Sequence, residues 1–259
     1  MIKEKLTYDK LIELVNENKN KEYKDGIFNE FVDKNSCLDF KCSSCSKCCE
    51  KKSVCGLLLS PFDVYNMSNA LKLSCHDLIK NNYLKIGIGE NLKNLPVIFI
   101  NNDGKEKCIF LKDNKCFIYR YRPLICRTFP FVITAYDNKA YYMITTKIEG
   151  ECKYLHSNKV KIKEHIKIEN LDLLESAVIE FERLKDHLIT LVNSKNFLNL
   201  EKSIKDKVYS FYFHLFYIAQ KEIIDDNPYM ASNHMIKYFF EQLKELDKML
   251  KEEKLGRLY

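Results

Sequence analysis

The chain has 259 residues, 46% of them hydrophobic, and a formal net charge of +6 at pH 7. This length and apolar content are enough for a buried core, so we expect a folded globular protein. Charged residues interrupt the first fifteen positions every few residues. This pattern argues against a signal peptide or a transmembrane span and predicts a cytoplasmic protein.

The basic excess does not by itself predict nucleic-acid binding. The lysines are spread among glutamates and aspartates and do not form a basic block. If eight cysteines ionised to hold two divalent metals, they would add eight negative and four positive charges, and the positive excess would nearly disappear. We therefore expect ordinary solvated surfaces and no nucleic-acid partner.

The first part of the chain contains helix signals. Apolar residues at helical spacing predict a short amphipathic helix over residues 7–17. Residues 59–84 predict two further short helices. Ser60 is a suitable N-cap for the first, with Pro61 at the first helical position, and Ser74 is a suitable N-cap for the second.

The middle of the chain changes to a β pattern. Between residues 96 and 147, short apolar runs alternate with Asn-Asp-Gly and Asp-Asn turn signals, which predicts three to five short antiparallel strands. Cys126 lies in a loop-like segment between Pro123 and Pro130, and the two prolines argue against a regular strand there.

The last hundred residues have a helical pattern without cysteine. Three long segments carry apolar residues at helical spacing; they are 169–193, 200–224 and 229–254. Residues 210–219 are apolar nearly all round, but the run is too short to span a bilayer, so we expect a central core helix. The predicted fold is α+β. Residues 1–155 form a cysteine-rich metal-binding domain with short antiparallel strands, and residues 156–259 form a C-terminal three-helix region.

The most specific chemical feature is the run FKCSSCSKCCE, whose four thiols have the spacing CxxCxxCC. These are Cys42, Cys45, Cys48 and Cys49. Two intervening residues allow two thiolates to converge on one soft cation. Adjacent cysteines chelate a single ion only in a strained ring. We therefore expect Cys48 and Cys49 to point at different metals, or one of them to point into the packing.

Four further cysteines complete the predicted ligand set, and they are Cys108, Cys116, Cys126 and Cys152. Eight thiolates would supply two four-thiolate sites or one polynuclear cluster. The other three cysteines, Cys37, Cys55 and Cys75, follow no regular spacing and are interpreted as packing or spare thiols. Disulfides are the less favoured alternative, since eleven cysteines is an odd number and we expect a reducing compartment.

The identity of the metal stays open between iron and zinc. The spacing matches neither the bacterial ferredoxin run nor two separated CxxC pairs of structural zinc, and an iron–sulfur cluster is slightly favoured. Arg122 and Arg127 flank Cys126 and either offset thiolate charge or bond ordinary acceptors. His76 and His156 each lie near a cysteine and are either further ligands or ordinary histidines.

The two cysteine motifs together resemble the YkgJ-type cysteine-cluster family, a zinc- or iron-chelating domain. The resemblance covers about residues 37–155. It rests on CxxCxxCC and on a second motif formed by Cys108, Cys116, Tyr119, Arg122, Pro123, Cys126, Arg127 and Pro130, with Cys152 similar to the last family cysteine. Flagellin lysine N-methylases contain a similar cluster. That relationship implies an iron–sulfur enzyme that modifies protein lysines with S-adenosylmethionine.

The sequence lacks the signatures of other enzyme classes. It has no glycine-rich phosphate loop, GxGxxG, GxSxG or HExxH, and only seven glycines. No catalytic residue is assigned. We predict a metal-binding protein with an iron–sulfur cluster or zinc that modifies protein side chains. The alternative is a non-catalytic structural zinc module that binds a protein partner through its helical tail.

Overall fold

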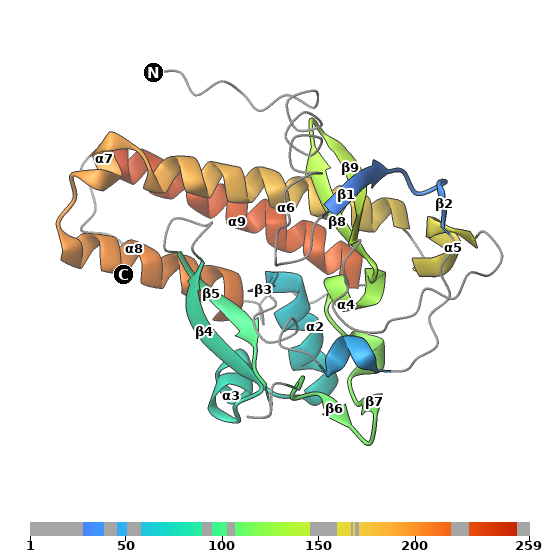
Figure 1. The fold of residues 1–259 in the computed structure, drawn as a ribbon. Coiled ribbons are helices and arrows are strands. Elements are labelled where there is room, and N and C mark those ends of the chain that lie inside the picture. Colours follow the sequence, from blue (N-terminus) through green and yellow to red (C-terminus); the bar gives the residue numbers. More distant parts are fainter. Residues whose placement is uncertain are drawn as a thin grey trace. The chain divides into compact units, whose positions relative to one another are not determined.

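The computed structural model describes residues 28–38, 46–50, 58–89, 95–102, 107–145, 160–166, 168, 171–218 and 228–252 (Figure 1). Two compact units are present, and each contains two segments of the chain. Unit 1 comprises Met1–Cys48 and Leu124–Ile179, and unit 2 comprises Cys49–Pro123 and Glu180–Tyr259. The helix predicted at residues 7–17 lies outside the described residues. The division into a metal-binding domain and a helical region at residue 155 stays a prediction.

Unit 1 contains a three-stranded antiparallel sheet with the strand order β1-β9-β8. The strands are β1 (Phe28–Val32), β8 (Phe131–Tyr136) and β9 (Lys139–Thr145). Strands β8 and β9 form a hairpin whose register runs from Phe131 opposite Ile144 to Tyr136 opposite Lys139. The two turn residues, Asp137 and Asn138, have φ angles of 47° and 60°. Positive φ at both positions suits a two-residue hairpin, so the Asp-Asn turn signal is confirmed.

The other elements of unit 1 are short, apart from the helix that ends it. They are β2 (Cys37–Leu38), β10 (Val160–Lys161), α4 (Leu124–Thr128), α5 (Ile162–Ile166) and the first part of α6 (Leu171–Val192). Strands β2 and β10 pair with each other. Helix α4 corrects the expectation of a loop around Cys126. Pro123 precedes the helix, where a proline fits, and the hydroxyl of Thr128 bonds the carbonyl of Leu124 at 3.1 Å.

A polar network, buried at Tyr142 and exposed at Asp172, joins three segments of unit 1. The hydroxyl of Tyr142, on β9, donates to Glu175 Oε1 at 2.8 Å, and Lys34 Nζ donates to Glu175 Oε2 at 2.8 Å. Lys34 also pairs with Asp172. Tyr142 is fully buried and its ring meets Phe131 edge to face, at 6.4 Å between ring centroids. This network ties the sheet and the chain after β1 to the start of α6.

Unit 2 begins with β3 (Leu58–Leu59) and two helices that the sequence predicts correctly. Helix α2 (Pro61–Leu71) starts after Ser60, and helix α3 (Cys75–Lys80) starts after Ser74. In each case the serine side chain accepts from the backbone of an aspartate three residues later, and that aspartate accepts from the serine backbone. Such a capping box satisfies two helix-terminal donors that would otherwise lack partners.

A second three-stranded sheet in unit 2 has the order β3-β5-β4, and two of its strands, the two-residue β3 and the longer β4, are not predicted from the sequence. Strand β4 (Leu84–Gly89) pairs along its whole length with β5 (Leu95–Ile100). The two glycines in LKIGIG weaken the strand signal. Gly87 has a packing reason, because a Cβ atom at this position would lie 2.7 Å from the ring of Phe99. The glycine therefore allows a phenylalanine to cover the strand.

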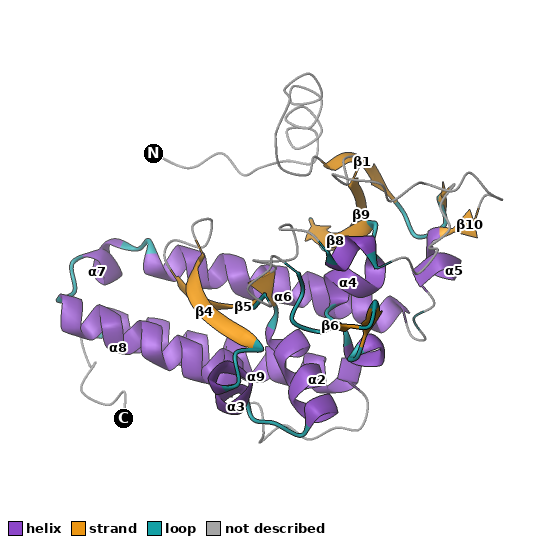
Figure 2. Ribbon diagram, turned by 60° about the horizontal axis from the view of Figure 1, so that its bottom comes forward, coloured by secondary structure: helices purple, strands orange, loops and turns teal. Residues whose placement is uncertain are grey.

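Most of the predicted helical tail belongs to unit 2, and Figure 2 draws its helices in purple. It comprises the end of α6, α7 (Lys195–Leu198), α8 (Lys202–Phe213), a π-helical turn (His214–Ile218, labelled η5) and α9 (Pro228–Lys251). The predicted helix over 200–224 is thus α-helical only to Phe213; residues 219–227 lie outside the described residues. No helix in the described part of the chain is both long and apolar enough to cross a membrane.

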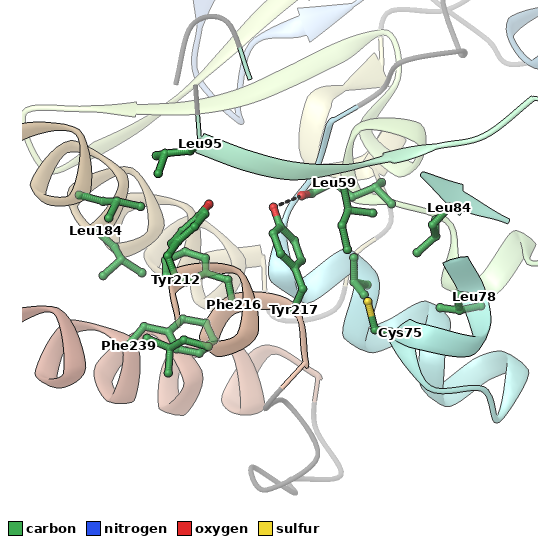
Figure 3. Packing of buried hydrophobic residues seen from close by; sticks show 14 of the residues in the cluster. Leu59, Cys75, Leu78, Leu84, Leu95, Leu184, Tyr212, Phe216, Tyr217 and Phe239 are labelled. Atoms are coloured by element: carbon green, nitrogen blue, oxygen red, sulfur yellow. Dashed lines mark hydrogen bonds between the residues drawn. The ribbon is translucent and has the colours of Figure 1, made fainter. Parts of the chain in front are cut away.

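The core of unit 2 forms around the aromatic end of α8 and the π-helical turn (Figure 3). Phe216 stacks on Phe239 of α9, with ring centroids 4.7 Å apart, and both side chains are buried. The buried hydroxyl of Tyr217 donates to the carbonyl of Leu59 at 3.2 Å. The run at 210–219 is therefore a core element over its described residues, as its composition predicts.

Candidate metal centre

Five of the eight predicted ligands lie within the described residues, and their exposure differs. Cys48 is exposed, Cys49, Cys116 and Cys126 are partly buried, and Cys108 is buried. Cys48 and Cys126 belong to unit 1, whereas the other three belong to unit 2. Cys42, Cys45 and Cys152 lie outside the described residues.

The backbone of unit 2 brings Cys49 and Cys108 together. The N–H group of Cys108 donates to the carbonyl oxygen of Cys49 at 2.9 Å. Cys49 ends a short 3-10 helix, η1 (Lys47–Cys49), and Cys108 forms an isolated antiparallel bridge with Asn102. Asn102 follows the buried strand β5, so the position of Cys108 is fixed to the sheet of unit 2. The sequence pattern does not identify Asn102 as part of this arrangement.

A tight hairpin then places Cys116 close to Cys108. Strands β6 (Leu111–Lys112) and β7 (Lys115–Cys116) are joined by Asp113 and Asn114, whose φ angles are 48° and 57°. Leu111 is paired with Cys116 across the hairpin, and its N–H group donates to the carbonyl of Cys108 at 2.9 Å. The two cysteines therefore lie on either side of the Asp113-Asn114 turn.

These three cysteines lie at the edge of an apolar core. Cys108 is 6% exposed and is part of the core cluster of unit 2, and Cys49 and Cys116 pack against that cluster. Phe110, two residues after Cys108, is stacked on Tyr83 with ring centroids 5.5 Å apart. An uncompensated thiolate is costly in such surroundings. A metal ion would supply the compensating charge, so the donor type and its burial fit a soft metal.

Arg122 follows Cys116 by six residues in the sequence. A 3-10 turn, η4 (Tyr119–Tyr121), leads to it, and its guanidinium carbon lies 4.0 Å from the centroid of the Tyr119 ring. Its Nε atom is buried and has no hydrogen-bond partner among the described residues. A buried N–H without an acceptor is costly, so Arg122 has one donor available for a group that the structure does not contain.

The described residues by themselves contain no complete metal site. No group of three or more His, Cys, Asp or Glu side chains in this part of the chain is arranged to hold a metal ion. His76 is exposed on α3, and His156 and Cys55 lie outside the described residues. Cys37 is exposed on β2.

Cys75 packs in the core, as expected for a cysteine outside the motifs. It is 7% exposed, and burial raises the pKa of its thiol to about 11. At neutral pH this thiol is therefore protonated, which is the form expected of a packing cysteine.

Comparison with known proteins identifies the same region. A family model named CxxCxxCC, described as "Putative zinc- or iron-chelating domain", matches residues 41–153. The chain is also 30% identical over 167 residues to the uncharacterized protein MJ0661 of Methanocaldococcus jannaschii, covering 59% of this chain and 81% of that protein. No solved structure matches the chain. On the evidence of these two matches and of its cysteine motifs, the chain belongs to the CxxCxxCC family of zinc- or iron-chelating domains.

Proposed function

We propose that this protein binds an iron–sulfur cluster or zinc through Cys42, Cys45, Cys48, Cys49, Cys108, Cys116, Cys126 and Cys152. The observation that carries the proposal is the backbone hydrogen bond between Cys49 and Cys108. It joins the end of the first cysteine motif to the start of the second. Soft thiolates are the ligands preferred by zinc and by iron–sulfur clusters, and the family is a zinc- or iron-chelating one.

Arg122 has a supporting role in this proposal. A site with four thiolates around zinc carries a net charge of about −2. The buried Nε–H of Arg122 has no acceptor among the described residues, and a thiolate or sulfide would satisfy it. Such a bond would stabilise the anionic ligand and remove the cost of the unpaired donor.

A finer proposal concerns the reaction. We propose a cytoplasmic enzyme that modifies protein side chains, with S-adenosylmethionine as the cosubstrate, in the manner of flagellin lysine N-methylases. Its support is the resemblance of the cysteine motifs alone. The bound metal would supply redox or Lewis-acid chemistry, and the protein substrate would be recognised by the parts of the chain outside the cluster.

The burial of Cys108 favours a second candidate, a non-catalytic zinc module. A metal held by Cys108 together with cysteines of the first motif, including those outside the described residues, would cross-link two segments at the edge of the core. Such closed sites contribute directly to folding. In that case the C-terminal helices would bind a protein partner. Acid-labile sulfide separates the candidates, because a structural zinc site contains none.

The test is the metal and sulfide content of protein purified without oxygen, with its visible absorption spectrum. Cys116→Ser is the main variant, since this side chain is only partly buried, and Cys37→Ser is the matched control from outside the motifs. We expect Cys116→Ser to lose at least half of the bound metal and the control to keep it. Equal metal content in both, with native far-UV circular dichroism, would refute the ligand assignment.

The wild-type spectrum then distinguishes the metals. Iron with sulfide and visible absorption supports a cluster, and a titration with S-adenosylmethionine should follow. Colourless protein with zinc and no sulfide supports the structural module, and the search turns to protein partners. Wild-type protein with neither metal, when purified anaerobically from cells supplied with both, would contradict the proposal as a whole.

A further inference from the structure

Unit 2 contains a pocket whose lining comes from β4, β5, α8 and the π-helical turn. Helix α8 packs on β5, and Figure 1 shows these elements as ribbons. Its volume is about 580 Å³, which is within the range of about 300–1,000 Å³ typical of small-molecule sites. Eight described residues line it, and they are Ile86, Pro96, Asp206, Tyr209, Ser210, Phe213, His214 and Ile218. None of them belongs to the cysteine motifs.

The wall formed by α8 presents two rows of side chains. Asp206, Ser210 and His214 are spaced by four residues and form a polar row, because residues i and i+4 are neighbours on a helix surface. Tyr209 and Phe213 form an aromatic row beside it. One helix therefore lines the same space with hydrogen-bonding groups and with aromatic rings.

The aromatic row is held in place by the core behind it. The ring of Tyr209 meets Phe197 edge to face, with centroids 5.6 Å apart, and the ring of Phe213 contacts Tyr217 at 5.2 Å. Tyr217 is in turn fixed by its hydrogen bond to Leu59. Because these rings are supported, they form a preformed surface for a ligand.

Asp206 sets the charge of the pocket. It is the one lining residue with a fixed charge at neutral pH, and it has no ion-pair partner among the described residues. Its neighbour Lys205 donates to the carbonyl of Leu198 at 2.7 Å and so is engaged elsewhere. Burial and the Asp206 carboxylate also raise the pKa of Tyr209, so this phenol stays neutral.

The opposite wall is apolar and unusually open. Ile86, on β4, is 52% exposed although its strand partner Ile98 is fully buried. Pro96, which is paired with Ile88 two residues further along β4, lines the same pocket. An isoleucine left exposed at the edge of a pocket costs apolar burial that a ligand would recover.

We infer that this pocket binds a small organic cation, an amine with an apolar or aromatic body. The ammonium group would lie between the Asp206 carboxylate and the faces of Tyr209 and Phe213, where ring quadrupoles attract a cation. The carbon skeleton would lie against Ile86 and Pro96. An anion would be repelled by the same carboxylate. The inference goes beyond metal chelation and does not depend on it.

The test uses the full chain with its metal and three probes of similar shape: 2-phenylethylamine, 2-phenylethanol and phenylacetate. Ligand-detected NMR and titration calorimetry measure binding. We expect the amine to bind and to exceed both other probes at least tenfold in affinity. No binding of 2-phenylethylamine at millimolar concentration, or equal binding of the alcohol, would overturn the inference.

Two variants and a control locate the site. Asp206→Asn should weaken amine binding at least tenfold and remove the preference over the alcohol. Ser210→Phe should fill the pocket and abolish binding of every probe. Both positions are exposed, so the fold should persist. Asp186→Asn, an exposed aspartate on α6, removes the same charge outside the pocket and should change nothing. Equal effects of Asp206→Asn and Asp186→Asn would assign the binding to net charge and refute the site.

Discussion

The buried hydroxyl of Tyr142 provides a sharp test of the polar network in unit 1. Tyr142→Phe removes one oxygen and leaves the ring against Phe131. The lost bond is 2.8 Å long and has an ionised acceptor, Glu175. Hydrogen bonds to charged groups contribute about 1.5–3 kcal/mol. Two effects keep the loss below the upper end of this range: Glu175 keeps its bond to Lys34, and phenylalanine has no hydroxyl that must be dehydrated on folding. We therefore expect the free energy of unfolding to fall by about 2 kcal/mol.

Thermal and urea unfolding followed by circular dichroism measure this loss. A change of about 2 kcal/mol lowers the Tm of a chain of this size by about 4–8 °C. Tyr136→Phe is the matched control, because this tyrosine lies on the same hairpin, is partly exposed and has no hydrogen bond from its hydroxyl among the described residues. A Tm within about 1 °C of wild type for Tyr142→Phe, or an equal shift for both variants, would refute the reasoning.

Three further predictions follow from described contacts. Phe239→Ala removes a fully buried ring stacked on Phe216 and should lower the free energy of unfolding by about 3–5 kcal/mol. The control Tyr238→Ala removes an exposed ring and should lower it far less. Equal losses for the two variants in urea unfolding would contradict the packing. His187→Leu removes a buried Nε2 that has no partner among the described residues, so it should raise the Tm, and a lowered Tm would contradict this. Lys34 lowers the pKa of Asp172 below 3.8, and the pKa of Lys34 is raised above 10.5 by its hydrogen bonds to Asp172 and Glu175. Stability from this pair should therefore be lost as pH falls below about 4 or rises above about 10.5, and Asp172→Asn should reduce the acid loss measured by urea unfolding.

Local signals explain which parts of the fold are predictable from the sequence. The capping serines Ser60 and Ser74 act on donors three residues away, so the starts of α2 and α3 can be read from a few letters. The Asp-Asn turns at 113–114 and 137–138 are equally local, because their positive φ angles depend on those two residues. The long helices of the tail follow from periodic apolar positions.

The features that the sequence did not reveal depend on distant partners. Strand β4 contains two glycines and becomes a strand because β5 pairs with it and Phe99 covers Gly87. The five-residue helix α4 is too short to show a periodic pattern. The π-helical turn after Phe213 has a composition suited to an ordinary helix, and its aromatic residues are fixed by contacts with Leu59 and Phe239.

Of all these features, the difference between a ligand cysteine and a packing cysteine is the hardest to predict from the sequence. Cys75 and Cys108 are both buried in the same core, at 7% and 6% exposure, so burial does not separate them. What separates them is the backbone. Cys75 begins a capped helix, whereas the amide of Cys108 is bonded to Cys49, a member of the first cysteine motif.

The pair Cys75 and Cys108 therefore compares the two roles within one core. Replacing either by Ala removes one sulfur from a buried position and costs packing in both cases. If Cys108 is a ligand, added zinc or reconstituted iron and sulfide should stabilise the Cys75→Ala variant as strongly as wild type, because metal binding is linked to folding. The Cys108→Ala variant should gain much less. An equal gain in Tm for both variants would mean that Cys108 is only a core residue, whatever its place in the motif.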